Sequence, residues 1–324
     1  MDSKFDKNLY RLDDKKAKII IDCDPGVDDT ACLVYALFDE NVDLKLITTV
    51  VGNVSVDLTT RNALHLLDLL NVDVPVAKGA CCALKRVSPT AEFIHQADGF
   101  GGYVPPKTTN RKPIDIDAVE AMYQTIMAGD GDIVPVLLGP QTNMANLLTI
   151  HPDVKSKIPK IVMMGGAPYG NPDYPEHISF NLSSDPDAFK VVLESGIPLV
   201  MIPSIMGREW AHLSEDFVES LKKINDVGKL LSTAYSKYYE PKYLPEKRVT
   251  TNDSCTFFAH VYPKMFKFIK AKATVDTEKF FGRTIIDFTD DGNINFACAV
   301  NREAFLNLLI DELHKLDHIK FTIE

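Results

Sequence analysis

The sequence predicts an α/β fold: an open, mostly parallel twisted sheet flanked by helices, in a single domain. Short apolar runs alternate with helical periodicity five or six times along the chain, as in stacked βα units. The length of 324 residues allows one domain or two, but no linker, repeat or low-complexity tract divides the chain. We therefore expect residues 1–17 to be a charged, mobile N-terminal extension and residues 18–324 to form the domain.

The individual elements follow from the same patterns. Apolar runs of strand length predict strands at residues 18–21, 44–51, 74–77, 133–138, 160–164 and 197–202. Helical patterns fall at 61–70, 116–127, 141–148 and 185–195. Asp185 precedes Pro186 and is expected to cap the last of these helices. From about residue 213 we expect a helical region and then a cluster of strands near 271–298.

Composition and charge exclude several classes of function. The formal net charge is −10, and no Lys/Arg cluster forms the basic face that nucleic acid requires, so we expect no nucleic-acid partner. The charged N-terminus lacks a signal-peptide core, and no run of about 18 apolar residues predicts a membrane span. The six cysteines show no zinc spacing and fit reduced thiols. A cytoplasmic protein acting on a small molecule is expected.

The segment IIIDCDPGVDD, residues 19–29, is the strongest chemical signal. A buried strand leads through a tight turn at Pro25 and Gly26 into a helix start, and it carries the carboxylates of Asp22, Asp24, Asp28 and Asp29. Carboxylates packed into one turn repel each other unless a cation, hydrogen-bond donors or water surround them. We therefore expect a metal ion or a charged reaction centre here, with Asp22 in a supporting role.

Polar or Gly-rich turns also end other expected strands. Asn53, Asn143 and the 164–166 turn would meet the carboxylates at one edge of a parallel sheet. The resulting crevice suits a ligand rich in hydroxyl groups. Both asparagines also fit a plainer role, because Asn often stabilises turns and helix caps through backbone hydrogen bonds.

Five blocks in order carry a family resemblance. DCDPGVDD (22–29), ITTVVGN (47–53), LLGPQTN (137–143), MMGGAPYGN with SFNLSSDPDA (163–188), and TNDSC (251–255) resemble the successive motifs of the nucleoside hydrolases, the inosine/uridine-preferring ribohydrolases. The resemblance implies their Rossmann-like fold and a calcium-dependent hydrolysis of the N-glycosidic bond of ribonucleosides. Ribose and free base would be the products, in the usual setting of nucleoside salvage and purine or pyrimidine metabolism.

The same resemblance implies roles for individual residues. The Ca²⁺ ligands would be Asp24, Asp29, the main-chain carbonyl of Leu138 and Asp253, and oxygen donors of this kind suit Ca²⁺. Asp28 would be the general base for a water that the metal binds and orients. Contacts to the ribose or to the water would come from Asp28, Asn53, Met164, Asn171, Asn181 and Asp253.

Residues near the leaving base are also implied. His95, beside the glycines of residues 99–102, corresponds to a family histidine on a mobile loop and is a second catalytic candidate. A surface role for a lone loop histidine is the competing interpretation. Tyr235, Tyr238 and Tyr239 lie on a stretch that closes over the base in the family, although packing alone explains them nearly as well.

Two departures from the family pattern concern substrate contacts. Asn252 stands where purine-active members carry a histidine before the last metal aspartate, and an amide cannot act as a general acid. Ser179 stands where a glutamate usually grips the ribose. Both positions remain substrate-binding candidates, and the preferred base stays open.

Two other classes of function compete with this interpretation. A haloacid-dehalogenase-like phosphatase would use Asp22 as its nucleophile, but its motif wants Thr or Val at position 26, which is Gly26. A non-catalytic nucleoside-binding relative would explain Asn252 and Ser179, but it has little need for Asp28. Since family members are commonly dimers or tetramers, we also expect a homo-oligomer.

Overall fold

The computed structural model describes residues 5–102, 109–166, 179–236, 238 and 247–321. In this part of the chain nine strands form one sheet in the order β3-β2-β1-β4-β5-β6-β9-β7-β8. Neighbouring strands from β3 to β9 run parallel, whereas β7 pairs antiparallel with β9 and β8. The strand bounds are β1 Ala17–Cys23, β2 Val42–Thr49, β3 Val76–Lys78, β4 Val134–Leu137, β5 Ile161–Met164, β6 Leu199–Ile202, β7 Phe266–Val275, β8 Thr284–Phe288 and β9 Ile294–Val300.

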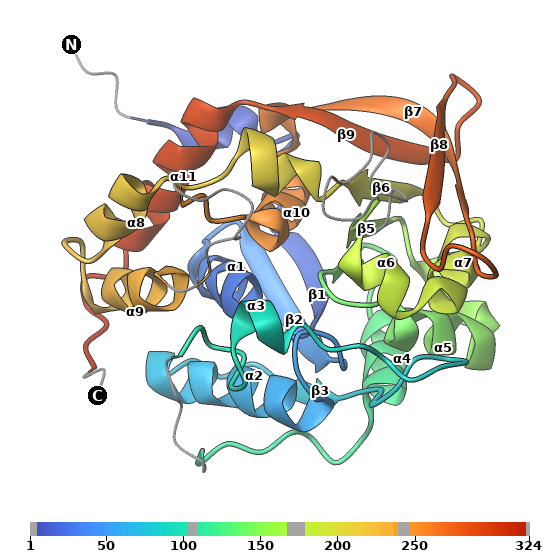
Figure 1. Cartoon of the computed structure of the whole chain (residues 1–324), viewed down its shortest axis with the longest axis horizontal. Coiled ribbons are helices and arrows are strands. Elements are labelled where there is room, and N and C mark those ends of the chain that lie inside the picture. The colour runs from blue at the N-terminus through green and yellow to red at the C-terminus, as the bar shows by residue number, and fades with distance from the viewer. Residues whose placement is uncertain (1–4, 103–108, 167–178, 237, 239–246, 322–324) are drawn as a thin grey trace.

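Helices cover both faces of the sheet (Figure 1). Helices α1, α2, α9, α10 and α11 pack in one apolar cluster, and α4, α5 and α7 in another. Figure 1 shows α8, α9 and α11 at the end of the molecule away from α4, α5 and α7. The α-helix bounds are α1 Val27–Phe38, α2 Val56–Leu70, α3 Glu92–His95, α4 Ala118–Ala128, α5 Thr142–Ile150, α6 Phe180–Ser184, α7 Pro186–Leu193, α8 Glu215–Leu221, α9 Asp226–Tyr235, α10 Asn252–Val261 and α11 Arg302–His314.

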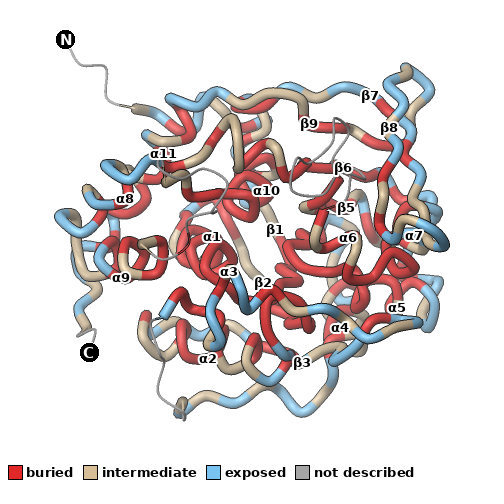
Figure 2. Tube along the Cα trace, viewed as in Figure 1, coloured by how far each residue is buried: buried red, intermediate tan, exposed pale blue. Residues whose placement is uncertain are grey.

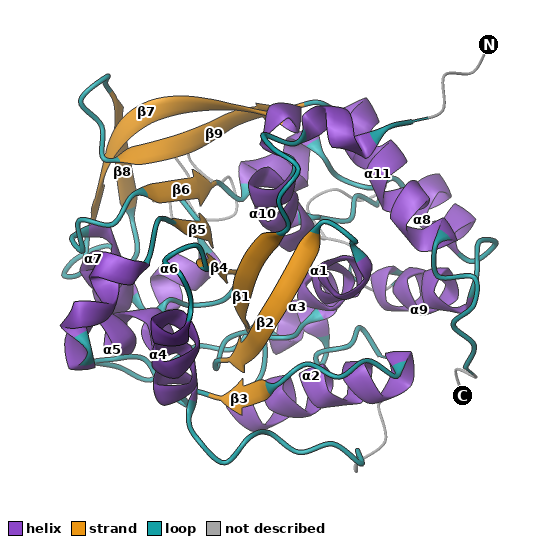
Figure 3. Ribbon diagram, turned by 180° about the vertical axis from the view of Figure 1, so that it is seen from behind, coloured by secondary structure: helices purple, strands orange, loops and turns teal. Residues whose placement is uncertain are grey.

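Strand β1 lies at the centre of this arrangement because both of its faces are apolar. Ile19 and Ile21 belong to the first cluster, whereas Ile20 points into the second, as the two-residue period of a strand requires. Figure 2 shows the buried run through β1 and α1. The chain passes from β1 outward to β2 and β3 and later from β4 outward to β5 and β6, so the strand order reverses between β1 and β4 (Figure 3). Ligands of open α/β sheets bind at such a reversal, beyond the carboxyl ends of the strands.

The expected βα order is confirmed, with differences at the element boundaries. The strand cluster near 271–298 is a three-stranded antiparallel end of the sheet. The cap at Asp185 is also confirmed, because its carboxylate accepts the backbone N–H of Ala188 at 3.0 Å. Among the helices of the described residues, none is long and apolar enough to cross a membrane.

The described part of the N-terminal segment, residues 5–17, differs from the mobile extension expected of residues 1–17. Residues Lys7–Tyr10 form a short 3-10 helix, and Lys7 is only 4% exposed. Its ammonium contacts the buried carboxylates of Asp39, at 2.8 Å, and Glu312. A buried charge needs such partners, so this segment is packed as part of the fold.

Candidate active site

The carboxyl end of β1 places two aspartates at the point where the strand order reverses. Asp22 is the last but one residue of β1 and is buried. Its Oδ1 accepts hydrogen bonds from Thr48 Oγ1 on β2, at 2.6 Å, and from Asn143 Nδ2 at the start of α5, at 2.8 Å. These contacts tie β1 to the neighbouring segments on both sides. Asp22 therefore helps to hold together the segments that surround the site, which agrees with the supporting role expected of it.

Asn143 is likewise a structural residue of this edge. Its Nδ2 also donates to the carbonyl of Thr49 at 3.0 Å, and its Oδ1 accepts the N–H of Ala80 at 2.9 Å. It is fully buried, and its amide is saturated by protein groups. The plainer interpretation of Asn143 thus describes its contacts better than a ligand contact does.

Asp24 follows directly after β1 and is enclosed by two loops. Its Oδ2 accepts the backbone N–H of Asn53 at 2.8 Å. A Cβ placed on Gly52 would collide with Oδ2, and one on Gly139 would collide with Oδ1. The loops after β2 and β4 can approach this carboxylate only because glycine stands at both positions.

Asp29 links the turn after β1 to the start of α1. Its Oδ2 accepts the N–H of Gly26 at 3.1 Å and its Oδ1 accepts the N–H of Asp24 at 3.2 Å, so it satisfies two backbone donors of the turn. Asn53 Nδ2 donates both to this carboxylate, at 2.9 Å, and to the carbonyl of Asp24, at 3.0 Å. Asn53, predicted as a site residue, thereby fixes both aspartates.

A cluster of three buried carboxylates lies where α1 and α10 begin. One oxygen each from Asp28, Asp29 and Asp253 lies within 4.8 Å of the other two. The carboxylates of Asp29 and Asp253 interact directly, and each shifts the pKa of the other. Asp253 Oδ1 is buried and has no hydrogen-bond partner among the described residues. The cluster therefore fits a cation bound by oxygen ligands, which would satisfy that atom and offset the repulsion among the three carboxylates.

In the absence of a cation, burial shifts the pKa values of the four carboxyl groups of this site. Burial, and then the charge of Asp29, raises the pKa of Asp28 to about 8. Burial also raises the pKa of Asp24, with Asp29 as the next cause, and that of Asp253, with Asp28 as the next cause. Burial raises the pKa of Asp29 as well, although backbone N–H groups oppose the rise. Perturbed carboxylates of this kind are typical of metal or catalytic sites.

The expected sugar contacts gather beside this cluster. Asn181 donates from Nδ2 to the main-chain carbonyl of Leu138, which is the oxygen expected to bind the metal, and it also contacts Met164 Sδ at 3.9 Å. Ser179 Oγ accepts the N–H of Gly166 at 3.4 Å. The ends of β4 and β5 and the start of α6 are thus brought together. Asn171 lies outside the described residues.

The candidates for contact with the base lie on the α1 and α10 side. Asn252 is the first residue of α10, and its buried Oδ1 has no hydrogen-bond partner in the described part of the chain. Tyr238 makes a side-chain hydrogen bond to Asp28 and is almost fully buried. The family resemblance places Tyr238 over the base, but no spacing in the sequence reveals its bond to Asp28. Tyr239 lies outside the described residues.

His95 differs from the mobile-loop histidine that was expected. It ends the short helix α3, is 4% exposed, and accepts the N–H of Val27 at Nδ1, at 3.1 Å. Its ring packs against Tyr238 with a centroid distance of 4.9 Å. Burial lowers the pKa of His95 to about 3, so the ring is neutral at physiological pH. It therefore supports the N-terminus of α1, next to Asp28.

Comparisons with known proteins agree with this geometry. Residues 19–307 match the family model described as inosine-uridine preferring nucleoside hydrolase. A non-specific ribonucleoside hydrolase, RihC, from Escherichia coli is 36% identical over 295 residues, covering 89% of this chain and 95% of its own. A pyrimidine-specific ribonucleoside hydrolase, RihA, also from Escherichia coli, is 34% identical and covers 91% of this chain and 97% of its own.

Solved structures give the same result. A purine-preferring ribonucleoside hydrolase from Gardnerella vaginalis superposes with a TM-score of 0.87 at 30% identity, covering 94% of this chain and all of its own. The plant nucleoside hydrolase PpNRh1 superposes with a TM-score of 0.84 at 28% identity, covering 92% of this chain and 99% of its own. These similarities exclude the hypothesis that the protein is a haloacid-dehalogenase-like phosphatase. The chain belongs to the inosine-uridine preferring nucleoside hydrolase family and is a hydrolase of N-glycosyl bonds.

Proposed function

We propose that this protein is a Ca²⁺-dependent ribonucleoside hydrolase in which Asp28 is the general base. The observation that carries the proposal is the cluster of Asp28, Asp29 and Asp253 at the reversal of strand order, with a buried oxygen that has no hydrogen-bond partner in the described part of the chain. Its donors are carboxylates, without His or Cys within the cluster, and oxygen donors favour Ca²⁺ over softer ions.

The metal would be held by Asp24, Asp29, Asp253 and the carbonyl of Leu138. Three of these groups lie at strand ends or at the start of α1, and the fourth at the start of α10, so the fold brings them to one edge. Bound Ca²⁺ supplies positive charge that keeps these carboxylates ionised, orients a water and lowers the pKa of that water.

The chain's own residues carry the proton transfer and the positioning. Asp28 accepts a proton from the attacking water, whose oxygen forms a bond to the anomeric carbon of the ribose. The bond from that carbon to the base nitrogen breaks, and its electron pair leaves with the base. The Tyr238 hydrogen bond fixes the Asp28 carboxyl group. Asn181, Met164 and Ser179 lie where they can hold and pack against the sugar.

The base is the least constrained part of the substrate. Relatives named as non-specific, pyrimidine-specific and purine-preferring enzymes all resemble this chain. The Oδ1 of Asn252, which has no partner among the described residues, can accept a hydrogen bond from substrate, but the amide cannot protonate a leaving purine. We expect Asn252→His to raise turnover of inosine relative to uridine and Asn252→Ala to lower turnover of both.

The direct test is ribose release from inosine, uridine, cytidine, adenosine and guanosine by the calcium-loaded protein. We expect turnover of at least one of them, loss of activity with a chelator, and recovery when Ca²⁺ is added back. Asp28→Asn should lower kcat by about 10²–10⁴-fold. Asp290→Asn, in the exposed turn between β8 and β9, is the matched control and should keep full activity.

Two results would contradict the proposal. Tight binding of nucleosides without ribose release would favour a non-catalytic relative. Full activity in the presence of a chelator, with Ca²⁺ absent by elemental analysis, would remove the metal from the reaction. We also propose a cytoplasmic homo-oligomer, for which sedimentation at several protein concentrations is the test.

A further inference from the structure

A pocket lies at the edge of the sheet opposite the carboxylate cluster. Its volume is about 530 Å³, and Ala17, Val134 and Lys160 line it at the amino ends of β1, β4 and β5. Helix α10 reaches both sites, because Asp253 is in its first turn and His260 in its last. Seven residues of helix separate them by about 10 Å along the axis. The pocket is thus distinct from the site where a ribonucleoside is proposed to bind.

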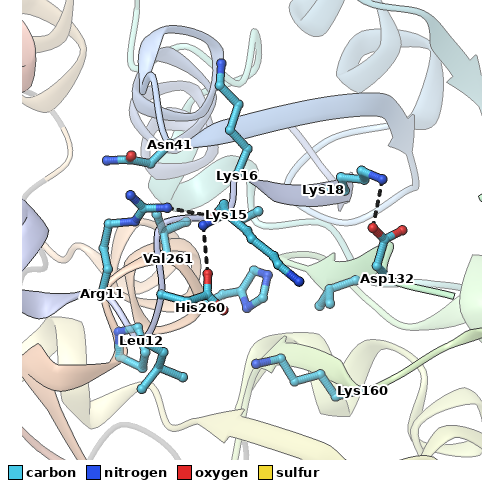
Figure 4. Close-up of a pocket in the computed structure, with 14 residues that line it drawn as sticks. Arg11, Leu12, Lys15, Lys16, Lys18, Asn41, Asp132, Lys160, His260 and Val261 are labelled. Atoms are coloured by element: carbon cyan, nitrogen blue, oxygen red, sulfur yellow. Dashed lines mark hydrogen bonds and ion pairs between the residues drawn. The ribbon is translucent and has the colours of Figure 1, made fainter. Parts of the chain in front are cut away.

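The lining of this pocket is strongly basic, although the chain is acidic overall. Five cationic side chains face two aspartates, which gives the lining a net charge of +3 in a chain of net charge −10. Four of the five cations come from residues 11–18, and the fifth, Lys160, comes from the segment just before β5. The charged lining residues are Arg11, Asp13, Lys15, Lys16, Lys18, Asp132 and Lys160, with His260 beside them (Figure 4).

Protein groups already engage part of this charge. Lys18 Nζ forms an ion pair with Asp132 at 2.7 Å, and Arg11 donates to the carbonyl of Lys15 at 2.6 Å. Asp13 accepts the backbone N–H of Lys15 at 2.9 Å. Two cations, Lys18 and Arg11, and both aspartates of the lining therefore already have polar partners.

Lys160 and His260 differ from these groups, because their polar atoms have no partner among the residues that the structure describes. Lys160 is half-buried and makes no hydrogen bond or ion pair with any described residue. Both ring nitrogens of His260 are shielded from solvent and also lack partners among those residues. Burial lowers the pKa of Lys160, and burial together with the nearby Lys160 charge lowers the pKa of His260 to about 3. Figure 4 shows the ring and the ammonium facing the same space.

We propose that this pocket binds the phosphate group of a small phosphorylated molecule, with Lys160 and His260 as its main contacts. A phosphate carries several strong acceptor oxygens and close to two negative charges, so it can satisfy the ammonium and an imidazole N–H together. The volume falls within the range of small-molecule sites and exceeds what a phosphate ion alone fills. A phosphate monoester, such as a sugar phosphate, therefore fits better than the free ion.

Calorimetric titration of the purified protein with ribose 5-phosphate and with inorganic phosphate, in chloride buffer of constant ionic strength, tests this proposal. We expect saturable binding, tighter for the ester, and a loss of about tenfold in affinity in both Lys160→Gln and His260→Gln. If the two ligands bind equally well, the site belongs to free phosphate, and the phosphate contact is still supported. The thermal unfolding of each variant checks that it is folded.

Matched variants show whether phosphate binding belongs to this pocket or to another part of the protein. Lys155→Gln removes an exposed lysine five residues before Lys160 and outside the pocket, and should bind phosphate like the parent protein. Asp28→Asn alters the proposed active site and should also retain phosphate binding, whether or not the enzyme proves to be calcium-dependent. Three results would overturn the proposal: no saturable binding, affinity unchanged in both pocket variants, or an equal loss in Lys155→Gln.

Discussion

Replacing Asp28 should stabilise the metal-free protein while it removes the proposed base. Asp28 is 5% exposed, and its pKa of about 8 means that the folded protein holds it protonated at neutral pH. In the unfolded chain the same carboxyl group has its ordinary pKa of about 3.9 and is ionised. Unfolding therefore releases a proton, and the native state is disfavoured by the free energy of keeping the group neutral.

The size of the effect follows from the two pKa values. At pH 7 the unfolded carboxyl group lies about three units above its pKa, and each unit corresponds to about 1.4 kcal/mol, or about 4 kcal/mol in all. Asn lacks this term, and because the folded carboxyl group is neutral at pH 7, no charge in the first turn of α1 is lost with it. We expect Asp28→Asn to raise the free energy of unfolding by about 4 kcal/mol at pH 7.

The direction with pH is fixed by the same linkage. Because the folded-state pKa is raised, the stability is fully present below about pH 4 and is lost as the pH rises toward 8. The gain in Asp28→Asn should thus be close to zero at pH 4 and largest near pH 8. Urea unfolding in chelator, across this pH range, measures it, with the exposed Asp290→Asn as control. A destabilised variant, or a gain independent of pH, would refute the reasoning.

Three further predictions concern stability elsewhere in the fold. Asp185→Ala leaves two buried donors and the partly buried N–H of Leu84 without their acceptor and should cost about 2–5 kcal/mol in urea unfolding; a loss below 1 kcal/mol would contradict this. Lys7→Met leaves Asp39 and Glu312 without their buried cation and should cost about 3 kcal/mol, whereas a mobile extension would give no change in thermal unfolding. The parent protein should lose stability as the pH falls below 6.5, because His260 takes up a proton in the unfolded chain but stays neutral when buried in the folded protein. His260→Gln should make this loss smaller, by up to about 2 kcal/mol at pH 5 in chloride buffer. Parallel pH profiles of the free energy of unfolding for the two proteins would contradict the prediction.

The order of elements could be predicted because each one is a local pattern. Alternation of apolar runs and helical periodicity reports directly on what each segment buries. The boundaries of the elements were harder to predict from the sequence. Strand β2, for example, ends at Thr49 instead of residue 51. There the backbone N–H of Val50 still bonds to the carbonyl of Cys23, but the chain has left the regular ladder. Such endings depend on neighbouring loops that no local pattern records.

The site residues likewise differ in whether their contacts are local in the sequence or long-range. Asp24, Asp28 and Asp29 lie within one turn, so their mutual repulsion was visible in the sequence. The contact of Asp29 with Asp253 spans more than two hundred residues and came only from the resemblance. The buried position of Lys7 could not be foreseen, because a charged N-terminal stretch has the composition of a solvated tail until its partners are known.

His95 shows how structure and resemblance together refine a role. Its Nδ1 accepts the N–H of Val27, and a Cβ on Gly26 would collide with that nitrogen, so the turn and the ring fit closely. With a pKa near 3, the ring carries too little charge at neutral pH to act as an acid through protonation of Nδ1. We infer that it is a positioning residue, which holds the first turn of α1 and hence Asp28 in place.

The two roles predict different results for matched variants. If His95 positions the helix, His95→Gln can still offer an oxygen to the Val27 N–H and should keep a larger share of kcat than His95→Ala, which leaves that donor unpaired. If His95 supplied a proton, both variants would lose kcat equally, and the alkaline limb of the pH profile of kcat would change shape in both. The pH dependence of kcat for the parent protein and the two variants, on the fastest ribonucleoside substrate, distinguishes these outcomes. Equal losses of kcat would support a catalytic role for His95, because both variants lose a proton donor to the same extent.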